Sequence, residues 1–173
     1  MSDTNGYNEK YRPQFHFTAR KNWLNDPNGC VFHDGTYHLF FQHNPEGNKW
    51  GNMTWGHAVS TDLVHWTQLD NALRPYAGGT IFSGSAVVDT DNDSKLGTGI
   101  TPPLVAAFTH ARKPFGQAIA FSNDHGYTWN LHDNGRHVVP NQGLNEAERD
   151  PRIFRHEPSG KWIMVLWVED RKS

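Results

Sequence analysis

The feature that most constrains the fold is a pattern of short strands that recurs along the chain. Runs of Val, Ile, Phe, Tyr and Trp alternate with Gly, Pro, Asn and Asp, which is typical of strands and turns, and helical periodicity is scarce. The residues repeat as well: Ser60 and Ser122 stand 62 positions apart, and Trp66 and Trp129 stand 63 apart. This spacing predicts repeated units of four strands.

We expect two complete four-stranded units and the first two strands of a third. A turn at Asp34-Gly35 should join the first two strands as a hairpin. The expected strands are Cys30–His33, Tyr37–Gln42, Trp55–Ser60, His65–Leu69, Ser83–Asp89, Leu104–Thr109, Gln117–Ser122, Thr128–His132, Arg152–His156 and Lys161–Val168.

Four antiparallel strands repeating at this distance favour an all-β fold, namely a β-propeller with long loops. A sandwich of two packed sheets is the alternative that the pattern leaves open. Propellers usually have about four to eight blades, whereas ten strands make about two and a half. We therefore expect an incomplete propeller with unpaired strand edges on its open side. We assign residues 1–10 to an N-terminal tail and residues 11–173 to the partial propeller.

Charge and composition exclude several classes of protein. Sixteen Lys and Arg against 18 Asp and Glu give a net charge of −2, so nothing favours binding to nucleic acid or to an anionic membrane. No apolar run is long enough to cross a bilayer, and a single cysteine excludes an internal disulfide framework. The polar N-terminus lacks the layout of a secretory signal, which predicts a cytoplasmic chain unless a leader has been removed. The oligomeric state is left open.

Aromatic residues are abundant in a chain that is otherwise polar. There are 7 Trp, 5 Tyr and 10 Phe, and the mean hydropathy is −0.74. Polar chains rich in Trp often bind sugars, because a flat indole covers the apolar face of a sugar ring. We nevertheless expect most of these side chains in the core, where aromatics dominate packing.

A polar motif stands at the same point of each unit, just before its first strand. The three motifs are Asn25-Asp26, Phe82-Ser83-Gly84-Ser85 and Glu148-Arg149-Asp150-Pro151. First strands of propeller blades line the central channel, so Asp26 and Asp150 should face one pocket although 124 residues separate them. A carboxylate held on a rigid turn and ringed by donors suits a nucleophile. The alternative is that each Asp-Pro dipeptide only starts a turn.

Together these motifs resemble glycoside hydrolase family 32, which contains invertases, levanases, inulinases and related fructosyl-transferring enzymes. The resemblance extends from about Tyr11 to the C-terminus, in order and at sensible spacing. The matching segments are Trp23-Leu24-Asn25-Asp26-Pro27-Asn28-Gly29, Phe41-Gln42-His43-Asn44-Pro45, Trp50-Gly51-Asn52-Met53-Thr54-Trp55-Gly56-His57-Ala58, Phe82-Ser83-Gly84-Ser85 and Arg149-Asp150-Pro151.

The resemblance implies a five-bladed propeller that cleaves terminal β-fructofuranosyl units of sucrose, levan or inulin by a retaining mechanism, without a cofactor. It implies that Asp26 is the nucleophile and that Asp150 stabilises the transition state by hydrogen bonding to fructosyl hydroxyls. The residues implied in the fructose pocket are Asn25, Gln42, Trp50, Phe82, Ser83 and Arg149, with Trp23 and Trp55 nearby. A retaining glycosidase also needs an acid/base carboxyl about 5–5.5 Å from the nucleophile.

In the family that acid/base is a Glu in a Glu-Cys-Pro run of the fourth blade, and this sequence has no such run. The repeat places its equivalent roughly 60 residues after Asp150, beyond Ser173. None of the nearby Glu146, Glu148, Glu157 and Glu169 is assigned that role. We therefore expect the N-terminal portion of a catalytic propeller with little or no activity alone. An inactive fructan-binding fragment and a fructosyltransferase are the alternatives.

A metal site is not expected. His33, His38 and His43 recur every five residues, but no zinc-type spacing on a helix and no cysteine cluster accompanies them. The aspartates between residues 89 and 93 resemble a calcium loop in outline, yet the terminal bidentate Glu of such a loop is missing.

Overall fold

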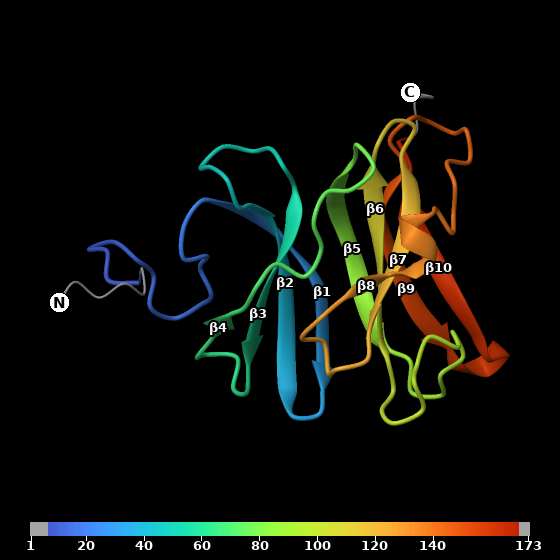
Figure 1. The fold of residues 1–173 in the computed structure, drawn as a ribbon, viewed down its shortest axis with the longest axis horizontal. Helices are drawn as coiled ribbons and strands as arrows, with labels where there is room; N and C mark the ends of the chain where they lie inside the picture. Colours follow the sequence, from blue (N-terminus) through green and yellow to red (C-terminus); the bar gives the residue numbers. More distant parts are fainter. Residues whose placement is uncertain (1–6, 170–173) are drawn as a thin grey trace.

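The computed structural model describes residues 7–169, which form three antiparallel β-sheets (Figure 1). Two short 3-10 helices, His132–Gly135 and Glu157–Ser159, are the helical elements of this part of the chain, and none of its helices is long and apolar enough to span a bilayer. The first sheet contains β1 (Trp23–His33), β2 (Thr36–Asn44), β3 (Thr54–Ser60) and β4 (Thr67–Gln68). The second contains β5 (Thr80–Val88), β6 (Leu104–Ala111), β7 (Gly116–Ser122) and β8 (Asn130–Leu131), and the third contains β9 (Arg149–His156) and β10 (Lys161–Trp167).

The sheets are the blades of an incomplete propeller. Within each sheet the strands follow sequence order outward from the first one, and β5 contacts both β1 and β9. Three successive sheets joined in this way differ from the two facing sheets of a sandwich, which excludes that alternative. The prediction of an all-β, incomplete propeller of about two and a half blades is confirmed.

The repeat is visible in side-chain contacts at the outer edge of the first two blades. Ser60 donates a hydrogen bond from Oγ to Asp62 Oδ1 (3.1 Å), and Ser122 donates the same bond to Asp124 Oδ1 (2.7 Å). Each aspartate then accepts backbone N–H groups of the following turn, including that of Thr128. Because these turns take up residues at the strand ends, β4 and β8 have two residues each, where longer strands were expected.

The first strands depart further from the sequence prediction. We expected the first strand to begin at Cys30, after the polar motif, but β1 already begins at Trp23. Asn25 and Asp26 stand together opposite the single residue Gln42 of β2, between two regular pairs, which is a β-bulge. Asn, Asp and Pro disfavour strands, and so the sequence suggested a turn here. A bulge accommodates them because it interrupts the ladder locally.

The same irregularity recurs in the other two first strands. In β5, Phe82 and Ser83 stand opposite Thr109 of β6. In β9, Asp150 and Pro151 stand opposite Leu166 of β10. The polar motifs therefore lie inside the first strands rather than before them, which corrects the sequence prediction. Each motif nevertheless overlaps the bulge of its own strand.

The largest hydrophobic cluster fills the space between the first two blades. Trp55 and Phe40 from the first blade meet Ile81 and Phe108 from the second, and all four are 1% exposed or less. Within the second blade, β5 and β6 come close together at Gly84, where a Cβ atom would lie 2.0 Å from the carbonyl oxygen of Ala107. Tight packing on both sides of β5 thus fixes the strand that carries the central bulge.

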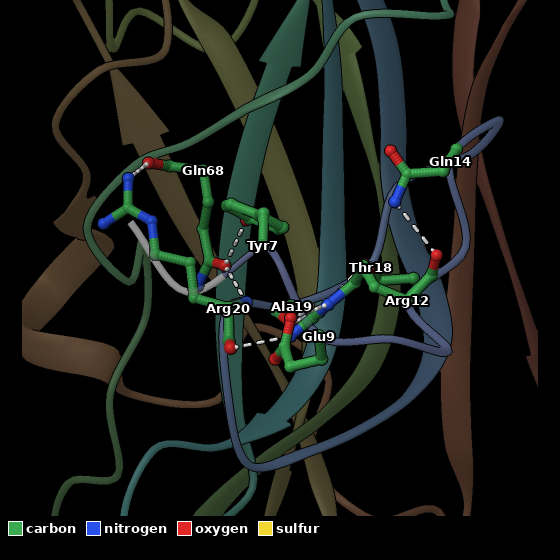
Figure 2. A network of polar contacts seen from close by, with 8 residues as sticks. All are labelled: Tyr7, Glu9, Arg12, Gln14, Thr18, Ala19, Arg20 and Gln68. Atoms are coloured by element: carbon green, nitrogen blue, oxygen red, sulfur yellow. Dashed lines mark hydrogen bonds and ion pairs between the residues drawn. The ribbon is translucent and has the colours of Figure 1, made fainter. Parts of the chain in front are cut away.

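Residues 7–20 lie against the first blade and are held by polar contacts (Figure 2). Arg12 donates through Nη1 to the carbonyl oxygen of Ala19 (2.5 Å). Gln68 of β4 accepts through Oε1 from the backbone N–H of Arg20 (2.8 Å) and from the hydroxyl of Tyr7 (3.4 Å). The segment is thereby attached to the outermost strand of its sheet. The domain boundary at residue 11 stays a prediction.

Two buried histidines cross-link β2 and β3. His38 Nδ1 lies 3.0 Å from His57 Nε2, and the His57 ring stacks on Phe40 with centroids 4.3 Å apart. Burial lowers the pKa of His57 to about 3, and the charge of His38 contributes. Burial also lowers the pKa of His38 to about 4, with contributions from His33 and His125. Both rings are therefore neutral at pH 7.

This pair predicts loss of stability in acid. The ordinary pKa of histidine is about 6.5, and the pKa values in the folded chain are near 3 and 4. Between these values the two histidines are protonated in the unfolded chain but not in the folded chain. The free energy of unfolding should fall as the pH drops through this window, by about 1.4 kcal/mol per pH unit for each histidine. Urea unfolding from pH 7 to pH 4 measures it. His57→Gln should flatten the profile, exposed His16→Gln should not, and equal profiles for the two variants would contradict the prediction.

Candidate active site

The three bulges meet at one small pocket. Its volume is about 140 Å³, and all three sheets contribute to its wall. The lining residues are Asn25, Asp26, Gln42, Trp50, Met53, Phe82, Ser83, Arg149 and Asp150. Eight of the ten site residues predicted from the sequence therefore lie together, and Asp26 and Asp150 open onto the same space.

The bulges explain why side chains distant in sequence converge. A bulge adds a residue on one strand, twists it and re-aims the side chains on either side. Asn25, Phe82 and Asp150 occupy the first bulged position of the three blades, Asp26 and Ser83 occupy the second, and Arg149 directly precedes the third bulge. Because the first strands lie side by side, equivalent irregularities point at the same mouth.

Asp26 is solvent-exposed, and its carboxylate accepts no hydrogen bond from residues 7–169. The sequence had suggested a carboxylate ringed by donors, and the structure corrects this. The backbone of β1, rather than side-chain donors, fixes its position. An uncommitted carboxylate keeps its lone pairs available for a ligand or for a reacting atom.

Asp150 is a half-exposed carboxylate in a more crowded setting. Burial raises its pKa, the positive charge of Arg149 lowers it, and the negative charge of Asp26 raises it again. Arg149 Nε lies 3.5 Å from Asp150 Oδ2. The contribution from Asp26 reflects the proximity of two like charges in one pocket.

Arg149 is held from the far side by an aromatic ring that the sequence did not single out. Its guanidinium carbon lies 3.7 Å from the centre of the Trp167 ring, a cation–π contact. Trp167 is the residue of β10 that pairs with Arg149 of β9. Strand pairing within the third blade was expected, but the register that brings these two residues together was not.

Gln42 carries an unused hydrogen-bond donor. The side chain is 3% exposed, yet its Nε2 has no partner among the described residues. Buried donors are nearly always paired, so an unpaired one that lines a pocket is suited to a ligand oxygen. This residue stands opposite the first bulge, beside Asp26.

Aromatic side chains form one side of the pocket. Trp50 is 60% exposed and meets Phe82 edge-on, with centroids 6.0 Å apart. Phe82 packs in turn on Phe115 at 5.4 Å. A flat apolar surface next to two carboxylates and an amide fits a small molecule that has both hydroxyls and an apolar face, such as a sugar.

Trp23 and Trp55, predicted near the pocket, do not line it. Trp23 donates through Nε1 to Asn25 Oδ1 (2.6 Å), and Trp55 donates to the carbonyl oxygen of Phe82 (2.9 Å). Both thus hold residues that do line the pocket. Met53, which is 1% exposed, is a lining residue that sequence reasoning missed. Its sequence signal was its place between the two tryptophans of one motif.

No group of three or more His, Cys, Asp or Glu that could bind a metal ion occurs within residues 7–169. In the loop with calcium-like spacing, the carboxylate of Asp89 accepts the backbone N–H groups of Asp93 and Ser94, each at 2.9 Å. That carboxylate therefore serves as a turn stabiliser.

With this geometry in view, the sequence matches the family described as glycosyl hydrolases family 32, N-terminal domain, over residues 16–173. The chain belongs to this family. It is 53% identical to a levanase of Bacillus subtilis over 171 residues and 45% identical to an extracellular exo-inulinase of Aspergillus awamori over 188 residues. These alignments cover 98% and 95% of the chain.

Solved structures of family 32 enzymes share the fold. The crystal structure of the exo-inulinase from Aspergillus awamori matches with a TM-score of 0.84 and 40% identity, over 92% of this chain. The β-fructofuranosidase of Schwanniomyces occidentalis, complexed with fructosyl-erythritol, matches with a TM-score of 0.80 and 42% identity, over 95% of this chain. The chain spans 36% and 32% of those two structures, and 25% of the levanase.

Proximity of the two carboxylates in this family 32 pocket gives a direct prediction. Asp26→Asn removes one negative charge and preserves shape, so the pKa of Asp150 should fall while burial keeps part of its elevation. Carbon-13 NMR titration of the Asp150 carboxyl, assigned through Asp150→Asn, measures the change. Asp34→Asn, at the β1–β2 turn, is the matched control that should leave this pKa in place. If the pKa of Asp150 is unchanged in Asp26→Asn, the two carboxylates do not interact and the prediction is wrong.

Proposed function

We propose that this chain is the N-terminal part of the catalytic propeller of a retaining β-fructosidase. The complete protein would hydrolyse terminal β-fructofuranosyl units of sucrose, levan or inulin. The observation that carries this proposal is the pocket in which Asp26 and Asp150 lie together with an unpaired amide donor and an aromatic wall. The family 32 relatives, among them a levanase and exo-inulinases, support the substrate class.

In the proposed reaction, Asp26 is the nucleophile. One of its carboxylate oxygens attacks the anomeric carbon as the bond from that carbon to the leaving sugar's oxygen breaks. The leaving oxygen takes a proton from a general acid, and the fructosyl group remains on Asp26 as an ester. Water, deprotonated by the same acid/base, then attacks the anomeric carbon and releases Asp26. Two displacements retain the stereochemistry.

Asp150 is proposed to stabilise the positively charged transition state. Positive charge develops on the fructosyl ring as the leaving group departs, and a fixed carboxylate stabilises it in a confined site. Asp150 would also accept hydrogen bonds from fructosyl hydroxyls. Arg149 favours the ionised form that this role requires, because its charge lowers the pKa of Asp150 against the effect of burial.

The remaining pocket residues are proposed to bind the fructosyl ring. Gln42 offers its unpaired Nε2 to a hydroxyl oxygen, and Asn25 and Ser83 add polar groups at neighbouring bulge positions. Trp50 and Phe82 would cover the apolar part of the sugar. Trp23 and Trp55 would act indirectly, through their bonds to Asn25 and Phe82.

The general acid is proposed to lie outside the described residues. Asp26 and Asp150 are the carboxylates that line the pocket within residues 7–169. Glu148 is nearby in sequence, but it is 1% exposed, and its carboxylate accepts the backbone N–H groups of Gln142 and Leu144. It therefore fixes a loop rather than supplying a proton.

This arrangement predicts binding without efficient cleavage by the 173-residue chain. Without general-acid assistance the leaving sugar departs as an alkoxide, which costs about 10²–10⁴-fold in rate. Sucrose and levan turnover by the purified chain should lie at least about 100-fold below that of a full-length family relative. Calorimetry should still detect binding of fructose to the chain. Asp26→Asn should remove any residual turnover. Turnover equal to the relative's would refute this assignment.

Fructan binding without catalysis is the second candidate for this chain. The unpaired amide of Gln42 and the exposed ring of Trp50 favour it, because both could hold a fructosyl unit with no proton donor present. Fructose binding that accompanies no measurable turnover would favour this candidate for the isolated chain. A chain that neither binds fructose nor cleaves the substrates would argue against both candidate functions.

Gln42→Leu tests the specificity of the pocket. Leucine has a similar size and removes an unpaired buried donor, so the free energy of unfolding should stay the same or rise. Affinity for fructose should fall up to about tenfold, since a hydrogen bond contributes roughly 0.5–1.5 kcal/mol and about 1.4 kcal/mol corresponds to a factor of ten. Calorimetry and urea unfolding measure the two quantities. Gln68→Leu, in β4 away from the pocket, is the matched control and should bind fructose as the parent chain does.

A further inference from the structure

Two residues of the second blade hold the backbone of the third blade at the pocket. Thr109 Oγ1 accepts a hydrogen bond from the backbone N–H of Asp150 (2.9 Å) and donates its own proton to Gln117 Oε1 (2.7 Å). Gln117 Nε2 donates to the carbonyl oxygen of Glu148 (2.9 Å). The bonded carbonyl and N–H belong to the two peptide groups that flank Arg149, so both peptide planes are fixed.

These contacts lie in the interior. Thr109 is 0% exposed and Gln117 is 1% exposed. The hydroxyl of Thr109 has one proton, which goes to Gln117, so its lone pair is free to accept from Asp150. Each polar group in this series of hydrogen bonds thus has a partner, and loss of any one bond would leave a buried polar group without a partner.

The backbone of Asp150 needs external support. Its φ is +59°, in the left-handed region that is sparsely populated by residues other than glycine. The next residue, Pro151, has no N–H to donate, and the register shift leaves both residues opposite Leu166. The ladder between β9 and β10 is therefore weakest where the carboxylate must be placed. Bonds from the second blade replace it.

A comparison between blades shows that this use of Thr109 is specific. Thr109 stands opposite the bulge of β5, as Gln42 stands opposite the bulge of β1. Gln42 lines the pocket and keeps an unpaired donor. Thr109 does not line the pocket, and its hydroxyl accepts a hydrogen bond from the next blade. The same structural position thus serves ligand contact in one blade and support in the other.

We propose that Thr109 and Gln117 are positioning residues that fix Arg149 and Asp150 in the geometry the pocket requires. This inference rests on the proposed function for its consequence, because the substrate contacts of Asp150 belong to that proposal. The clamp, meaning Thr109 and Gln117, does not touch the substrate. It acts through the orientation of the two peptide groups.

The decisive experiment asks whether the clamp keeps Asp150 near Asp26. In the parent chain, Asp26→Asn should lower the pKa of Asp150, as measured by carbon-13 NMR. In Thr109→Val, which keeps the shape and loses the hydroxyl, the same substitution should have a much smaller effect, because the carboxylate is no longer fixed in the pocket. Thr109→Ser retains the hydroxyl and should restore the response.

A matched control separates positioning from loss of stability. Ser85 also supports β9, since its Oγ donates to the carbonyl oxygen of Pro151 (3.0 Å) and accepts from the backbone N–H of Ile153 (2.9 Å). Ser85→Ala should destabilise the fold but keep the response of Asp150 to Asp26→Asn. If Thr109→Val does not fold, Gln117→Met, which frees Thr109 from its acceptor, should show a partial loss of the response.

Fructose affinity gives the second readout, measured by calorimetry. Thr109→Val should bind fructose about tenfold more weakly, and Thr109→Ser should recover most of that loss. If the parent chain binds no fructose, the proposed function fails, yet the NMR response still tests the clamp. A Thr109→Val chain that is folded and keeps the full response would overturn the inference.

Discussion

The site depends on one backbone constraint, the β-bulge that recurs in the first strand of each sheet. A regular strand sends successive side chains to opposite faces, and neighbouring residues therefore cannot share a pocket. The bulge breaks this alternation at Asn25-Asp26, at Phe82-Ser83 and at Asp150-Pro151. Because the three bulges lie at equivalent positions of adjacent blades, they gather polar side chains at one mouth. The long-range geometry of the pocket thus results from a short-range irregularity repeated three times.

The sequence was sufficient for the fold class and for most of the pocket. The spacing of Ser60 and Ser122 reflects equivalent turns, and the expectation that Asp26 and Asp150 share one pocket followed from that repeat. The bulges themselves could not be predicted, because Asn, Asp and Pro disfavour strands equally whether they end one or interrupt it. The contact between Arg149 and Trp167 was missed for a related reason, since it depends on strand register.

Electrostatics in the pocket is a balance of opposing effects. Two carboxylates that face one space repel each other, and burial adds to the cost of charging Asp150. Arg149 offsets part of this cost, although the pKa of Asp150 stays raised, and Arg149 is itself held between Asp150 and the ring of Trp167. The third blade therefore supplies a carboxylate together with a cation that favours its ionised form. Such a pair is suited to stabilising positive charge that appears only during a reaction.

The wall of the pocket is divided among three sheets, and this division has a mechanical consequence. A molecule bound there would touch β1, β5 and β9 at once, so pulling any two blades apart would break some of its contacts. By linkage, affinity for that molecule must then add to the resistance of the blades to separation. A bound molecule would therefore hold the three first strands together at the centre of the propeller, and an empty pocket would leave them less firmly associated.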